Sequence, residues 1–214
     1  MKKLLGLCLV LCGVGASTQS VAYDPMEDLV STAKQEINAK DAIENSKQRA
    51  LNDPRRKKVE KGYWQFFQGK QGAKPGEYCT AVFWKGSRMI SIVGPGGSYK
   101  GALLNFIAIE PPEGFPRPND AKAIDKVKVT LKQGSDAPAT ITAFNRSIGG
   151  FADEIAFAVP TIDAALAGME DRLAFSIDHA GRQIFALEWH AGLAAGEVLR
   201  KCLNGENVNG REVL

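Results

Sequence analysis

From Trp64 to Trp189 the chain consists of short segments in which apolar residues alternate with polar ones or form brief apolar runs. A period of two suits β-strands, because successive side chains of a strand point to opposite faces of the sheet. Turn-forming residues such as glycine, proline and aspartate separate most of the segments. The strand candidates are Trp64–Phe67, Tyr78–Trp84, Met89–Val93, Leu103–Ile109, Lys126–Lys132, Ala139–Phe144, Ile155–Val159, Leu173–Ile177 and Phe185–Trp189. These nine strands predict a mainly β fold, an antiparallel β-sandwich or barrel.

The segments between the strands have the composition of turns and loops. Asp178-His179-Ala180-Gly181 favours a tight hairpin turn between two alternating segments. Gly94-Pro95-Gly96-Gly97 predicts a β-turn with at least one residue at positive φ. Residues 111–118 contain four prolines and are expected to form a loop, because proline cannot donate a hydrogen bond to a sheet.

An N-terminal helix is expected before the strands, from Tyr23 to about Lys61. Asp24-Pro25 is a helix-start signal. An apolar stripe follows, made of Met26, Leu29, Val30, Ala33 and Ile37, which share one helical face. The stripe stops at Ile37, so the first turns are expected to dock and the rest to be solvated. Pro54 is predicted to end the helix and Arg55–Lys58 to form a basic linker.

Two further helices are expected within the β-rich part of the chain. Thr161 can cap a short helix that extends to Met169. A C-terminal helix is predicted over Leu193–Leu203, where apolar residues recur at helical spacing. The expected domain is therefore β-rich over residues 62–214, preceded by the helical segment of residues 23–61.

The first 22 residues have the pattern of a secretory signal peptide. Lys2 and Lys3 precede an apolar run over Leu4–Ala16, and Ser20-Val21-Ala22 supplies small residues for signal peptidase. The run is shorter than an ordinary membrane span. Cys8 and Cys12 each follow a leucine rather than the small residue that precedes a lipidated cysteine. We therefore expect a periplasmic or secreted protein without a lipid anchor and without a transmembrane segment in its mature chain.

We expect cleavage after Ala22. The mass of the protein exported by its native host should match a chain that begins at Tyr23, because the leader is removed during export. Recovery of an exported chain that still carries Met1 would contradict this prediction.

Two cysteines, Cys79 and Cys202, remain after the leader is removed. Two cysteines in an oxidising compartment usually pair, so a disulfide between them is expected. The alternative is two free buried thiols. A metal site at either cysteine is disfavoured, since no histidine or second cysteine lies at ligand spacing.

The charge of the chain is nearly balanced. The full sequence carries a net charge of +3, and without Lys2 and Lys3 there are 25 basic residues against 24 acidic ones. No overall field favours nucleic acid or an anionic membrane as a partner. The basic run Arg55–Lys58 is short and diluted by Glu60.

Few residues suggest catalysis or ligand binding. His179 fits turn chemistry, and His190 is expected to cap, pack or face solvent. Ser147 has no local partner and is expected in a loop. Asn145-Arg146-Ser147 is also an N-glycosylation sequon. No cofactor, metal ligand or catalytic residue is assigned, and the binding residues are unknown at this point.

Acidic pairs and aromatic residues leave alternatives open. Asp153-Glu154 and Glu170-Asp171 could belong to a carboxylate hydrolase, although neighbours on a strand point to opposite faces. Trp64, Phe67 and Trp84 could line the mouth of a barrel that carries a small apolar ligand.

The order of features resembles a family of secreted bacterial β-proteins, the invasion-associated locus B type. The residues that carry the resemblance are Trp64 opening a strand, Cys79 on the next strand, the Pro112-Glu113-Gly114 loop and the closing hairpin and helix over Leu187–Leu203. The resemblance covers about Tyr63–Leu203. It implies an extracytoplasmic β-sandwich without catalysis that associates with the cell envelope or a host.

We therefore expect a non-enzymatic protein that binds another macromolecule of the envelope or host. The carrier of a small apolar ligand and the hydrolase with an unrecognised carboxylate site remain as alternatives.

Overall fold

The fold is taken from a computed structural model that describes residues 54–120 and 123–214. The predicted leader and the predicted helix over Tyr23–Asp53 lie outside these residues. The described elements are, in chain order, α3 (Pro54–Lys61), β1 (Tyr63–Gln68), β2 (Cys79–Lys85), β3 (Arg88–Val93), β4 (Ala102–Ile109), β5 (Asp125–Gln133), β6 (Ala139–Ile148), β7 (Ala152–Val159), α4 (Ile162–Ala167), β8 (Leu173–His179), β9 (Arg182–Trp189), α5 (Gly192–Leu203) and β10 (Glu212–Val213).

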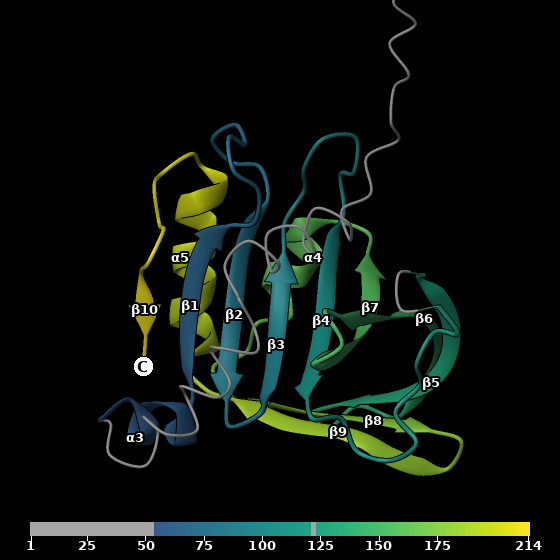
Figure 1. The fold of residues 1–214 in the computed structure, drawn as a ribbon. Coiled ribbons are helices and arrows are strands. Elements are labelled where there is room, and N and C mark those ends of the chain that lie inside the picture. The colour runs from purple at the N-terminus through teal and green to yellow at the C-terminus, as the bar shows by residue number, and fades with distance from the viewer. Residues whose placement is uncertain (1–53, 121–122) are drawn as a thin grey trace, which may run out of the picture.

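The ten described strands form one antiparallel sheet in the order β10-β1-β2-β3-β4-β7-β6-β5-β8-β9. The sheet curls, so that β8 and β9 at its far end cross one face of β1–β4 (Figure 1). Twist accumulates across many strands, and curling lets the apolar face of a wide sheet cover itself. The predicted mainly β, antiparallel class is confirmed, and the architecture is a curled half-barrel built from one continuous sheet.

An aromatic core fills the inside of the curl. We call the face of β1–β4 and β7 that looks toward β8, β9 and α5 the inner face, and the opposite one the outer face. On the inner face, the rings of Trp64 and Trp189 lie 5.2 Å apart, and those of Phe106 and Phe185 lie 5.3 Å apart. Tilted and edge-on ring pairs at such separations are favourable and bury large apolar areas. The interior is therefore occupied by side chains.

All nine predicted strands are present, and most are longer than predicted, β6 by four residues and β7 and β9 by three each. The prediction that Ser147 lies in a loop is wrong, because β6 continues to Ile148. Strand β7 begins at Ala152, directly after a turn in which Gly149 and Gly150 have φ of 58° and 76°. Glycine adopts these values without strain, so the two strands continue close to the turn.

Both expected turns are present, but the hairpin turn is shorter than predicted, because Asp178 and His179 belong to β8. In the β8–β9 hairpin, Ala180 and Gly181 have φ of 50° and 75°, as a two-residue turn with matching strand twist requires. At the other predicted turn, Gly97 has φ of 56° and the Gly94 N–H donates to the Cys79 carbonyl at 2.7 Å.

Both helices predicted after residue 160 are present, although α4 ends at Ala167 and not at Met169. Thr161 caps α4, with its Oγ1 accepting from the Ala164 N–H at 3.1 Å. Helix α5 lies on the inner face, where the Cys79–Cys202 disulfide joins it to β2. The predicted disulfide is thus present, with the two Cα atoms 5.8 Å apart.

The basic run Arg55–Lys58 differs from the expectation. Helix α3 begins at Pro54, and the run forms part of that helix instead of a linker. The predicted helix that ends at Pro54 lies outside the described residues. Proline is well tolerated in the first turn, where its missing N–H has no partner to lose. The Gly86 N–H donates to the Val59 carbonyl at 3.1 Å, which fixes α3 beside the β2–β3 turn.

None of the helices in the described part of the chain is long and apolar enough to cross a lipid bilayer.

Candidate functional site

The two histidines lie at opposite ends of β9 and do not share a site. His179 Nδ1 is 3.2 Å from the Gly114 carbonyl oxygen, and His190 Nε2 is 3.0 Å from the Lys61 carbonyl oxygen. His190 also packs edge-on against Phe83, with ring centroids 5.2 Å apart. An eight-residue strand separates the two imidazoles, a length of about 25 Å. Each histidine therefore has a local packing role.

The three aromatic residues of the carrier alternative do not line one cavity. Trp64 is fully buried on the inner face and donates from Nε1 to the His190 carbonyl oxygen at 2.6 Å. Phe67 and Trp84 pack on the outer face, in a separate apolar cluster. The strand register explains the separation, because Trp64 lies opposite Phe83 and the outward Trp84 lies opposite Tyr63.

The acidic dipeptides do not form carboxylate pairs. Asp153 and Glu154 are buried neighbours on β7 that point to opposite faces, as the sequence predicted. Asp153 Oδ2 accepts from Arg117 Nε at 2.5 Å, whereas Glu154 pairs with Arg146. Glu170 and Asp171 are exposed at the start of the β8 hairpin. The two carboxylates of β7 thus form ion pairs with two different arginines.

Asn145, the acceptor residue of the sequon, is 3 % exposed within β6. A buried side chain in a strand leaves no room for a glycan, so the sequon is not an acceptor in the folded protein.

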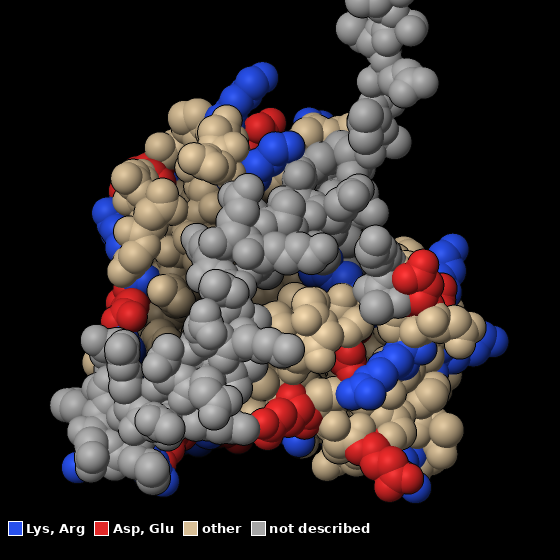
Figure 2. Space-filling view, viewed as in Figure 1, with Lys and Arg blue, Asp and Glu red and all other residues tan. Residues whose placement is uncertain are grey.

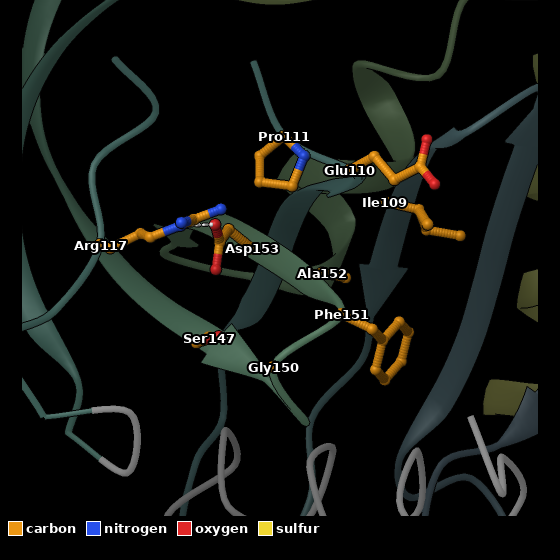
Figure 3. A pocket seen from close by; sticks show the side chains of 9 residues that line it. All are labelled: Ile109, Glu110, Pro111, Arg117, Ser147, Gly150, Phe151, Ala152 and Asp153. Carbon is orange, nitrogen blue, oxygen red and sulfur yellow. Dashed lines mark hydrogen bonds and ion pairs between the residues drawn. The ribbon is translucent and has the colours of Figure 1, made fainter. Parts of the chain in front are cut away.

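A pocket of about 460 Å³ lies at the end of the sheet where β4 leaves it and β6 turns into β7. We call it the rim pocket. It is lined by Ile109, Glu110, Pro111, Arg117, Ser147, Gly150, Phe151, Ala152 and Asp153. Figure 3 shows Arg117 reaching toward Asp153, while the side chains of Glu110 and Phe151 point away from this pair. The pocket therefore combines one fixed ion pair with apolar walls.

The ion pair of the rim pocket joins a buried group to an exposed one. The side chain of Asp153 is 4 % exposed, and that of Arg117 is 63 % exposed. Arginine has five N–H donors, and the hydrogen bond to Asp153 uses the one on Nε. The carboxylate thus anchors the guanidinium, and the guanidinium faces solvent where a partner can reach it.

The proline-rich loop between β4 and β5 positions Arg117. Phe115 is 7 % exposed and belongs to the aromatic core. The β8–β9 hairpin holds the same loop, through His179 at the Gly114 carbonyl and through the ion pair of Arg182 with Glu113. The loop expected at residues 111–118 is therefore tied down at both the core and the hairpin, which limits the freedom of Arg117.

The chemical groups of the rim pocket do not form a recognisable catalytic set. Ser147 lines the pocket, but none of the nine lining residues is a histidine or cysteine that could activate it or act as a nucleophile. Glu110 points away from Asp153, so the two acids do not converge (Figure 3). Within the described residues, no three or more His, Cys, Asp or Glu side chains gather as a metal site would require.

Charges of both signs are interspersed on the side of the molecule in Figure 2, over β5, β6, β8 and β9. One exposed ion pair, Arg172 with Glu188, is well defined, with Arg172 Nη2 and Glu188 Oε1 2.5 Å apart. Its hydrogen bond and charge lower the pKa of Glu188 below the ordinary value. This pair lies outside the rim pocket and provides a control for substitutions there.

No protein-family model, curated protein or solved structure matches the chain.

Proposed function

We propose that this protein is a secreted or periplasmic, non-enzymatic protein that binds another macromolecule of the cell envelope or host. Export is supported by the signal-peptide pattern of residues 1–22. It is further supported by the Cys79–Cys202 disulfide, because structural disulfides persist in oxidising compartments.

The rim pocket is the observation that carries the binding proposal. Arg117 and Phe151 line it, and arginine and aromatic residues are the types that contribute most of the binding energy at protein interfaces. Because Asp153 holds Arg117 in place, little side-chain freedom is lost when a partner binds.

Substitution of Arg117 or Phe151 by alanine should therefore strongly reduce capture of the partner. The wild-type protein, tagged at its C-terminus, is incubated with a solubilised envelope fraction of the native host, and captured proteins are compared by quantitative mass spectrometry. We expect at least one captured protein to fall about tenfold or more with Arg117→Ala and with Phe151→Ala, as for an interface hot spot.

Arg172→Ala is the matched control, since it also removes an exposed arginine from an ion pair with a carboxylate. It should leave the capture of that protein unchanged. Equal capture by the wild type and all three variants would refute a role for the rim pocket. If the protein instead hydrolysed envelope polymers and this activity depended on Asp153, the hydrolase alternative would replace the binding proposal.

A further inference from the structure

The outer face of the sheet is apolar, although it looks away from the aromatic core. Strands β2, β3, β4, β6 and β7 contribute to it. Its buried apolar residues form two clusters, Val82, Met89, Ile107, Ile148 and Ala152 in one and Val93, Leu103 and Ala156 in the other. A face of this composition is stable in water only when another layer covers it.

These side chains are buried, with at most 8 % of any one of them exposed. Helices α4 and α5 do not provide this burial, because Leu166 of α4 and Leu199 of α5 belong to the aromatic core on the inner face. Figure 1 shows both helices behind the strands, and α3 at the lower end of the sheet. Within residues 54–120 and 123–214, no helix lies across the outer face, so the layer that covers it comes from elsewhere.

Buried polar atoms of the outer face also lack partners. Glu154 Oε1 and Asn105 Oδ1 are buried and accept no hydrogen bond. Both residues point to the outer face, since Asn105 Nδ2 donates to the outward Ser91 Oγ at 2.9 Å and Glu154 lies opposite Ile107. A buried acceptor without a donor costs about 1–3 kcal/mol. The covering layer should therefore bring hydrogen-bond donors as well as apolar side chains.

We propose that residues 23–53 of this chain cover the outer face and that the stripe Met26, Leu29, Val30, Ala33 and Ile37 faces it. A helix over Met26–Ile37 is about 18 Å long. The outer face from β2 to β7 is three strand spacings wide, or about 15 Å. The lengths of the stripe and of the face therefore agree.

The path of the chain permits this arrangement. Residues 38–53 connect the stripe to α3, which the Val59–Gly86 hydrogen bond fixes beside the β2–β3 turn at one edge of the outer face. Sixteen residues can extend over about 50 Å, far more than the width of the face. Lys34 flanks the stripe on the predicted helix and carries donors for a buried acceptor.

Oxidation of Met89 tests the proposal in the full exported chain. Met89 belongs to the outer face and is 7 % exposed, whereas Met169 is buried in the aromatic core and serves as an internal reference. In the Leu29→Asp/Val30→Asp variant, hydrogen peroxide should oxidise Met89 about tenfold faster than in the wild type, with Met169 unchanged. The control Gln35→Asp adds a charge on the opposite side of the predicted helix and should leave both rates unchanged.

A photo-crosslinker tests the contact without weakening the stripe. Benzoylphenylalanine in place of Val30 should crosslink to peptides of β3 or β4 within the same molecule, and in place of Gln35 it should not. An intramolecular crosslink from position 30 supports the proposal even if the double Asp variant unfolds and exposes both methionines.

Three results would overturn the proposal. One is slow Met89 oxidation in the double Asp variant without a crosslink from position 30. The second is a crosslink from position 30 between two molecules, with Met89 protection that rises with protein concentration, because a second copy would then cover the face. The third is unfolding of the double variant with no crosslink from position 30.

Discussion

Replacement of Cys79 and Cys202 together by alanine should lower the free energy of unfolding by about 4 kcal/mol. The disulfide joins residues 123 positions apart, so it restricts most of the unfolded domain. In the chain-entropy model a loop of this length contributes about 4–5 kcal/mol, and removal of a native disulfide typically costs about 2–5 kcal/mol. The bond also attaches α5 to β2, so its loss weakens the packing of the last helix on the inner face.

Guanidinium unfolding followed by tryptophan fluorescence measures this loss. The midpoint should fall, and the m-value should rise, because the unfolded chain without the crosslink exposes more surface. A reducing agent should bring the wild type to the stability of the variant and leave the variant unchanged. A variant as stable as the oxidised wild type would show that the disulfide does not stabilise the fold.

The strands were predictable from the sequence because their signal is local. Each of the nine segments carries its own alternation or apolar run between turn residues. Strand β10 has only two residues and is defined by its pairing with Trp64 and Gln65 of β1. A local sequence pattern does not predict such a pairing. The curl of the sheet could not be predicted from the sequence either. Alternation indicates which side chains of a strand are buried, but it does not indicate which part of the protein covers them.

The β6–β7 hairpin shows why polar residues misled the prediction. Asn145-Arg146-Ser147 has the composition of a loop, yet these residues belong to β6. Arg146 lies directly opposite Glu154 in the register, so a charge partner from the next strand allows it to be buried. Cross-strand pairs of opposite charge stabilise a sheet, and they are invisible to a reading of one segment at a time.

The candidate site was only partly predictable. Asp153 was named as part of one of two acidic dipeptides, and its separation from Glu154 followed from strand geometry. Arg117 was not singled out, because its approach to Asp153 depends on the path of a proline-rich loop across 36 residues. In contrast, the spacing of three residues between Trp64 and Phe67 already places them on opposite faces of a strand, so the proposed aromatic mouth conflicted with the period of two.

Substitution of Glu154 by alanine should destabilise the fold by about 3–5 kcal/mol. The side chains of Arg146 and Glu154 are 2 % and 0 % exposed, and they form an ion pair on the outer face. Removal of Glu154 takes this ion-pair partner away from a guanidinium that is itself buried, and the loss of one member of a buried pair is strongly destabilising. The effect should appear as a lower denaturation midpoint in chemical unfolding, with near-native circular dichroism below the transition.

The double substitution Arg146→Met/Glu154→Leu should restore much of this stability, because it removes both charges and keeps apolar volume between the two clusters of the outer face. The exposed pair Arg172–Glu188 supplies the control. Glu188→Ala should cost less than about 1 kcal/mol, since solvent screens an exposed pair and hydrates the arginine that remains. Equal losses for Glu154→Ala and Glu188→Ala would mean that water reaches Arg146, although its side chain is 2 % exposed.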